Sequence, residues 1–313
     1  MLSRRHLRMK VMQVFYACQQ KETYLFEPAQ KQLQQSINST HNLYLYTLFL
    51  MREVAAYVKQ DKVRRAAKYL PTEEDKNLST AIFDNPFTQK LFADTDYNSL
   101  LKTRKLTALP EMEMVKKIYK TFSQTEDYQK YTQLTAPSLK DHAGIMRRFL
   151  AFLYEDETFI GHIEEKFANW DDDAAIISDT IKTLLYQFEK RGPVNDLHIF
   201  AQPEDWNEKL IFCGTLLQYA LKQNQTLTEL IQPHLQHWDV ERLTQIDILL
   251  LKLAICEFLY FPTIPTRVTI NEYIEIAKVY STPSSKNFIN GVLDKVMKSL
   301  NDEGKIQKTD RHQ

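Results

Sequence analysis

The side chains with the clearest chemical potential are basic and lie at the start of the chain. Arg4, Arg5 and Arg8 fall within residues 2–20, where basic and apolar residues alternate at helical spacing. Guanidinium groups bind phosphates with two parallel hydrogen bonds and stack on unpaired bases. The cluster therefore indicates a contact with nucleic acid, and the alternative is a solvated helix end.

The sequence contains none of the short motifs that mark common enzymes. There is no GxSxG, no P-loop, no HExxH and no GxGxxG. Only six of the 313 residues are glycine, whereas nucleotide-binding α/β folds need glycine in tight turns and where the backbone approaches a ligand. We therefore expect a protein that is not an enzyme, with no catalytic residues and no cofactor.

Two groups of residues have the composition of metal ligands. His234 and His237 are three residues apart, and Asp171–Asp173 are three consecutive carboxylates. A lone histidine pair is more often a helix end than a ligand set, and acidic residues at a helix start stabilise the helix dipole. The three cysteines are too far apart for a zinc site or a disulfide framework. We therefore expect no metal.

The elements that must position these side chains are predicted to be helices, so the fold class is all-α. The hydrophobic fraction is 43% and the net charge is zero, so a basic surface has to come from local clustering. The polar stretch 123–137 is predicted to be a linker, which divides the chain into a helical region 1–137, a second helical region 138–300 and a polar tail 301–313. Helices are predicted at 2–20, 42–59, 112–122, 179–188, 211–221, 227–235, 243–260, 269–280 and 284–300, with two more before Trp170 and short ones within 71–110.

Three further patterns bear on these helices. Thr269 and Glu272 have the spacing of a capping box, which predicts a helix start at Thr269. Basic residues cluster at 59–68, which indicates a solvated face or, less often, an auxiliary RNA surface. No apolar run reaches the ~18 residues of a membrane helix, and no signal cleavage site follows the N-terminus, so we expect a cytoplasmic protein without membrane contact.

A pattern recurs at an offset of 68 residues. Trp170 is repeated as Trp238 and Glu189 as Glu257, and several apolar positions match at the same offset. Apolar matches between helical hairpins are frequent by chance, whereas a repeated Trp-Asp pair is rarer. Chance and duplication are therefore equal alternatives.

The most specific pattern lies in residues 264–294. It contains Ile-Pro, Ile-Asn-Glu, Ile-Glu, Ala-Lys, Phe288 and Asn-Gly-Val-Leu-Asp in that order. This segment resembles the NusB transcription-antitermination family, and residues 2–20 resemble the arginine-rich first helix of that family. The resemblance covers about 2–20 and 205–300, so 21–200 correspond mostly to an insertion. It implies a NusB-like pair of packed helical bundles that is enlarged by extra helices.

The resemblance also implies which residues bind RNA, because the family holds RNA between the first helix and the start of the last. Asp247 matches the acidic position on the helix that faces the partner NusE, a ribosomal protein. His6 stands at an arginine position of the family, and Ser281 and Ser284 stand where a glycine and an aspartate are usual, which lowers the positive charge or alters the loop. The implied RNA-binding residues are Arg4, Arg5, Arg8, Tyr16, Ser284, Lys286 and Phe288. For Phe288, a position in the hydrophobic core is an equal alternative to stacking on a base.

The function implied by the resemblance is transcription antitermination. The protein would bind single-stranded RNA of the boxA type in ribosomal RNA leader transcripts, together with NusE, and join the RNA polymerase antitermination complex. One alternative is a helical interaction module that has lost RNA binding, which the zero net charge favours. Another is the RNA-binding domain of an RNA cytosine methyltransferase, but the 22 residues after Gly291 leave no room for its catalytic domain.

Overall fold

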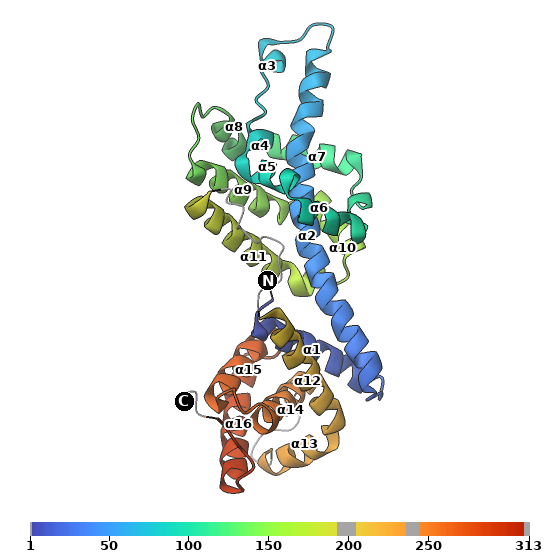
Figure 1. The fold of residues 1–313 in the computed structure, drawn as a ribbon, viewed down its shortest axis with the longest axis vertical. Coiled ribbons are helices and arrows are strands. Elements are labelled where there is room, and N and C mark those ends of the chain that lie inside the picture. The colour runs from blue at the N-terminus through green and yellow to red at the C-terminus, as the bar shows by residue number, and fades with distance from the viewer. Residues whose placement is uncertain (1, 193–204, 236–243, 310–313) are drawn as a thin grey trace. The chain divides into compact units, whose positions relative to one another are not determined.

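The computed structural model describes residues 2–192, 205–235 and 244–309, and every regular element in these ranges is a helix. The predicted all-α class is therefore confirmed. The chain forms two compact units. Unit 1 comprises residues 38–202, and unit 2 comprises residues 2–37 together with 203–313 (Figure 1).

Unit 1 is built around an aromatic core. Phe122 and Phe149 stack with their ring centroids 4.3 Å apart, and Phe87 meets Phe188 edge to face at 5.4 Å. Large rings of this kind bury much apolar area and prefer such offset or edge contacts. The helices of unit 1 are α2 (Phe26–Ala66) from residue 38 on, α3 (Glu73–Lys76), α4 (Ala81–Asp84), α5 (Pro86–Ala93), α6 (Thr95–Thr103), η1 (Leu106–Ala108), α7 (Met112–Ser123), α8 (Glu126–Thr132), α9 (Leu139–Leu153), α10 (Glu157–Lys166) and α11 (Trp170–Arg191).

The polar stretch 123–137 is not a linker, because it contains α8. Thr125 caps this helix by accepting a hydrogen bond from the amide of Tyr128, and both Tyr128 and Tyr131 are buried in the core of unit 1. Helix α8 also contacts α9. The predicted boundary at residue 137 therefore falls inside unit 1. A polar composition concealed two tyrosines at helical spacing whose rings supply the buried area.

Unit 2 surrounds one central helix. The residues of α14 from 249 to 258 are all buried, and α14 contacts α1, α12, α13, α15 and α16. A helix that is apolar on all sides has to lie inside a bundle, and Figure 1 shows α15 and α16 beside α14. The helices of unit 2 are α1 (Arg4–Gln20), residues 26–37 of α2, α12 (Trp206–Lys222), α13 (Asn224–Ile231), η2 (Gln232–His234), α14 (Gln245–Tyr260), α15 (Thr266–Tyr280) and α16 (Ser285–Asp302).

The first helix belongs to unit 2 although most of unit 2 comes from the other end of the chain. Leu7, Val11, Val14 and Phe15 form the predicted apolar stripe and are at most 2% exposed. Helix α1 contacts α12, α14 and α15, which provide the apolar surfaces that bury this stripe. Residues 38–202 therefore fold as an insertion between two parts of one bundle.

The repeat at an offset of 68 residues includes whole helices as well as single residues. Adding 68 to the bounds of α9 and α10 gives 207–221 and 225–234, which coincide with α12 and with α13 plus η2. Glu189 pairs with Arg147 at 2.7 Å, and Glu257 at the matching position pairs with Arg8. Trp238 lies outside the described residues, but the matching helices favour duplication over chance. The buried pairs at this offset are Phe149 and Leu217, Leu153 and Leu221, and Ile163 and Ile231.

Candidate nucleic-acid interface

The arginine-rich end of α1 begins at a serine cap. The hydroxyl of Ser3 accepts a hydrogen bond from the amide of His6, and the His6 ring accepts one from the amide of Ser3. This reciprocal arrangement satisfies two amides that have no partner within the helix. It starts α1 at Arg4 and places Arg4, Arg5 and Arg8 in its first two turns.

Arg4 and Arg5 lie at the surface of unit 2, and each is paired with a carboxylate. Arg4 pairs with Glu208 on α12, and its guanidinium lies 5.7 Å from the ring centroid of Phe212. Arg5 donates from Nη2 and Nε to the two oxygens of Glu272, at 2.8 and 3.1 Å. This hydrogen-bonded pair lowers the pKa of Glu272 below its ordinary value, so the carboxylate is charged at neutral pH.

Arg8 is buried, which corrects the expectation that it faces RNA. Its side chain is 3% exposed, and it donates from Nε and Nη2 to the oxygens of Glu257 at 2.6 and 2.9 Å. Burial alone would lower the pKa of Arg8, but the hydrogen bonds and charge of Glu257 outweigh it and raise the pKa. Arg8 therefore joins α1 to α14 inside unit 2.

Glu257 is the centre of a buried polar network. Besides Arg8, it accepts hydrogen bonds from the hydroxyls of Thr269 at 3.1 Å and Tyr273 at 2.8 Å. The predicted capping box of Thr269 and Glu272 is therefore wrong. Helix α15 begins at Thr266 with Pro265 at the capping position, so Thr269 already lies inside the helix and turns its hydroxyl toward Glu257.

Helices α1 and α15 lie alongside each other in a defined register. The contacts Arg5 to Glu272 and Gln13 to Tyr280 both join residues that are 267 apart in the sequence. Two contacts with the same offset, eight residues apart, require helices that run in the same direction. Continued by one more turn, this register brings Tyr16, which is 37% exposed, level with the loop that precedes α16.

The start of α16 supplies both surface and core residues. Ser284 and Lys286 are exposed, as expected for contact residues. Phe288 is 4% exposed, so its ring packs inside unit 2 and does not offer a face for stacking. The core alternative therefore holds for Phe288, because its position on α16 matches the buried stripe that continues through Ile289 and Val292.

Asp247 is buried as well, which corrects its expected role as a direct contact with a partner protein. Its side chain accepts hydrogen bonds from Ser281 at 2.8 Å and Ser285 at 2.9 Å, and it forms a capping box with Thr244 at the start of α14. These bonds attach the loop before α16 to α14. Ser281, which stands where the family usually has a glycine, thus helps to hold the aspartate in place together with Ser285.

A cavity of about 520 Å³ opens between the N-terminus of α1 and the start of α15. Basic and apolar side chains both line it, and Val268 is 46% exposed. Carboxylates facing the arginines were not predicted as part of a site. Glu272 lies within the Ile-Asn-Glu motif and could have been found, whereas nothing in the sequence singles out Glu208. The lining residues are Ser3, Arg4, Arg5, His6, Arg8, Ile264, Pro265, Val268 and Glu272.

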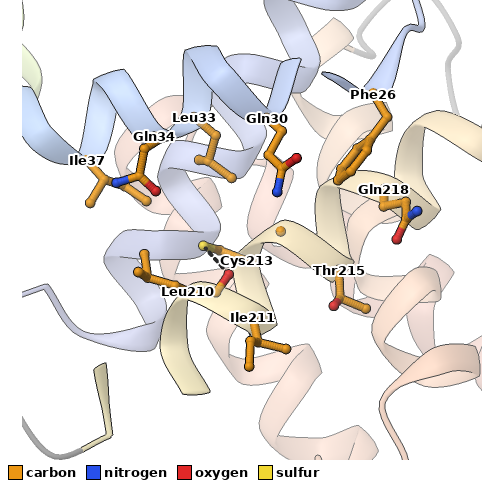
Figure 2. A pocket seen from close by; sticks show the side chains of 11 residues that line it. Phe26, Gln30, Leu33, Gln34, Ile37, Leu210, Ile211, Cys213, Thr215 and Gln218 are labelled. Carbon is orange, nitrogen blue, oxygen red and sulfur yellow. Dashed lines mark hydrogen bonds between the residues drawn. The ribbon is translucent and has the colours of Figure 1, made fainter. Parts of the chain in front are cut away.

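A second groove of about 390 Å³ lies between residues 26–37 of α2 and residues 210–218 of α12 (Figure 2). Leu33 and Ile37 line it, while Gln30, Gln34 and Gln218 provide neutral amides. No charged side chain is among its lining residues, so this groove offers no cation to a phosphate.

The basic stretch at the end of α2 is largely neutralised. Arg64 and Arg65 donate to the buried carboxylate of Asp61 at 2.5 and 2.7 Å, and Lys68 pairs with Asp75 at 2.7 Å. These contacts favour the structural interpretation of the stretch over an auxiliary RNA surface.

Metal and membrane features are absent from the described residues. Within ranges 2–192, 205–235 and 244–309, no group of three or more His, Cys, Asp or Glu side chains is arranged to hold a metal ion. His237 lies outside these ranges. No helix in the described part of the chain is long and apolar enough to cross a membrane.

Unit 2 is a helical bundle whose first helix carries arginines beside a cavity at the N-terminus of that helix. Sequence comparisons identify the family to which this bundle belongs. The NusB family profile matches residues 179–298. The chain is 41% identical over 100 residues to the transcription antitermination protein NusB of Salinibacter ruber, which is 32% of this chain and 62% of that protein. It is 40% identical to the transcription antitermination protein NusB of Koribacter versatilis, over 34% of this chain and 73% of that protein. It is 37% identical to the NusB protein of Desulfitobacterium hafniense, over 39% of this chain and 86% of that protein. The chain therefore belongs to the NusB family.

Family membership has two consequences. Proteins of this family are not enzymes, in agreement with the expectation from the sequence. The matches with these relatives cover at most 39% of this chain, so it carries a large region in addition to the NusB part. The chain spans less than two thirds of the Salinibacter ruber protein, at 62% of its length. No solved structure matches this chain.

Proposed function

We propose that this chain is a transcription antitermination protein that binds single-stranded RNA through unit 2. Its RNA target is a boxA-type element in ribosomal RNA leader transcripts, and its partners are NusE and the RNA polymerase antitermination complex in the cytoplasm. The names of the relatives and the family match support the general activity. The identity of the RNA and of NusE rests on the resemblance of residues 264–294 and 2–20 to the family.

The observation that carries the proposal is the common edge formed by α1, α15 and the start of α16. The shared register of Arg5 with Glu272 and of Gln13 with Tyr280 aligns α1 and α15 over two turns. The edge thereby presents Arg4 and Arg5 at one end and an exposed tyrosine at the other. Cationic groups in line with an aromatic ring are the usual elements of a groove for single-stranded nucleic acid.

Each exposed residue has a distinct role along this edge. Arg4 and Arg5 bind phosphates, because a guanidinium matches the geometry of two phosphate oxygens. The ring of Tyr16 stacks on an unpaired base. Lys286 adds a positive charge at the start of α16, whose first turn contains no acidic residue. Ser284, exposed beside it, donates from its hydroxyl to the RNA backbone.

Three residues support this edge from inside unit 2. Arg8 anchors α1 on Glu257, Asp247 holds the loop before α16, and Phe288 packs α16 into the core. They position the surface residues and do not themselves contact RNA or NusE.

A second candidate function is an interaction module that has lost RNA binding. The pairing of all three arginines with glutamates favours it, because a paired guanidinium attracts phosphate less strongly. This candidate predicts that NusE binds while RNA does not.

The experiment measures binding of purified protein to a boxA-type RNA and to a scrambled RNA, with and without NusE. The proposal predicts tighter binding to boxA-type RNA, strengthened by NusE and weakened when Arg4 and Arg5 are both replaced by Ala. Binding of NusE without binding of either RNA would instead establish the second candidate.

A further inference from the structure

Two kinds of side chain line the cavity at the N-terminus of α1. Ile264, Pro265 and Val268 give it apolar surface, and Arg4 and Arg5 from α1 give it cations. Its volume of about 520 Å³ is within the range of sites that hold a small organic group. An unpaired base needs such a slot, because its faces are apolar and its backbone is anionic.

Glu272 lines this cavity, and its carboxylate can accept more hydrogen bonds than it receives from Arg5 and Arg8. Its oxygens take two hydrogen bonds from Arg5, at 2.8 and 3.1 Å, and a long one from Arg8 at 3.5 Å. A carboxylate can accept about four hydrogen bonds, and the Glu272 side chain is 20% exposed. One acceptor position is therefore available to a group that enters the cavity.

A carboxylate at this point discriminates between the parts of a nucleotide. It repels a phosphate, and it accepts from the exocyclic amino group of adenine, cytosine or guanine, as glutamate does with the cytosine amino group in DNA grooves. Uracil has no amino group, and its imino N–H is flanked by two carbonyl oxygens that face the carboxylate unfavourably.

We propose that this cavity binds one unpaired base that carries an amino group, with Glu272 as the residue that reads the base. The base packs against Val268 and Pro265, its amino group donates to Glu272, and Arg4 and Arg5 bind the phosphates beside it. The inference rests on the proposed RNA-binding function and adds base selectivity at a defined position.

The test uses the full chain and short RNAs made of uridine, either unmodified or with one central cytidine, adenosine or guanosine. Binding is followed by fluorescence anisotropy. The wild type should bind each substituted RNA at least about tenfold more tightly than oligouridine, the lower end of the factor expected for one hydrogen bond to a charged acceptor.

Two variants separate base reading from phosphate binding. Glu272→Gln should reduce this preference to less than about twofold without weakening oligouridine binding, because an amide serves uracil as well as an amino base. Val268→Trp fills the slot from an exposed position and should also remove the preference. The matched control is Glu275→Gln, one turn further along α15, which pairs with Lys278 and does not line the cavity. It should keep the wild-type preference.

The outcomes distinguish the two proposals. Equal binding of all these RNAs by the wild type, with affinity that still depends on Arg4 and Arg5, refutes the base pocket and leaves RNA binding intact. A preference that survives Glu272→Gln also refutes it. Failure of the wild type to bind any RNA refutes the proposed function itself.

Discussion

Replacement of Arg8 by Ala should destabilise unit 2 strongly. The change removes both hydrogen bonds from the guanidinium to Glu257 and leaves that carboxylate fully buried beside two hydroxyl donors. Arg8 and Glu257 side chains are 3% and 0% exposed, so water cannot replace the lost cation without local opening.

The expected cost follows from the difference between breaking and replacing a buried ion pair. Removal of one partner leaves an uncompensated buried charge and costs about 3–5 kcal/mol. Neutralising both partners, as in Arg8→Met with Glu257→Gln, leaves no buried charge and should cost less than the sum of the single changes. Arg5→Ala is the control, because its pair is partly exposed and is worth about 1 kcal/mol or less.

The assay is urea unfolding followed by circular dichroism for the wild type, Arg8→Ala, the two single variants Arg8→Met and Glu257→Gln, the double variant that combines them, and the Arg5→Ala control. The expected order of stability is wild type and Arg5→Ala first, then the double variant, then Arg8→Ala. A loss of less than about 1 kcal/mol for Arg8→Ala would show that the Arg8–Glu257 pair is open in solution. Additive effects of the two single changes would contradict a direct interaction.

Three further predictions concern the surface and the chain end. Glu208→Gln should tighten RNA binding by up to about fivefold in a titration, because it frees Arg4 from a competing carboxylate, and weaker binding would contradict this role. Lys308→Ala should lower the free energy of unfolding by about 1 kcal/mol, since Lys308 donates to the carbonyls of Glu257 and Phe261 at the end of α14, and an unchanged urea midpoint would exclude this contribution. The pKa of Glu272 lies below its ordinary value of 4.5, so the stabilisation from its pair with Arg5 is present above that pH and is lost as the pH falls through the lower, folded-state pKa. The difference in the free energy of unfolding between the wild type and Glu272→Gln should therefore be constant between pH 6 and 8. It should become smaller only in acid, where the carboxylate of the wild type is protonated.

Helix positions could be predicted from the sequence wherever the apolar period was strong. The apolar face of α1 and the strongly apolar α14 were both evident from spacing, and the Ile-Pro turn marked the boundary between α14 and α15. The prediction failed at α8, where a polar sequence hides Tyr128 and Tyr131, and at the start of α15, where Pro265 begins the helix earlier than the Thr269 spacing suggested. In both cases local composition was outweighed by long-range packing.

The candidate site could be predicted only in part, because the residue types do not show which charges meet. The sequence indicated a cluster of arginines but gave no means of separating Arg8, which is buried on Glu257, from the exposed Arg5. It left Phe288 open between the core and the surface, and it gave no reason to expect Asp247 to be buried. These outcomes depend on contacts between residues more than 200 positions apart or on separate helices, which periodicity does not specify.

The proposed function depends above all on the binding of RNA phosphates by the exposed end of α1. The most direct test measures the affinity of wild type and of Arg4→Ala/Arg5→Ala for a boxA-type RNA at several salt concentrations, with melting temperatures measured in parallel. Each phosphate contact on a single strand contributes about 0.7 to the slope of log affinity against log salt. We expect the double variant to bind more weakly, with a slope smaller by about 1.4 and a nearly unchanged melting temperature. The same affinity and slope for both proteins would contradict this expectation.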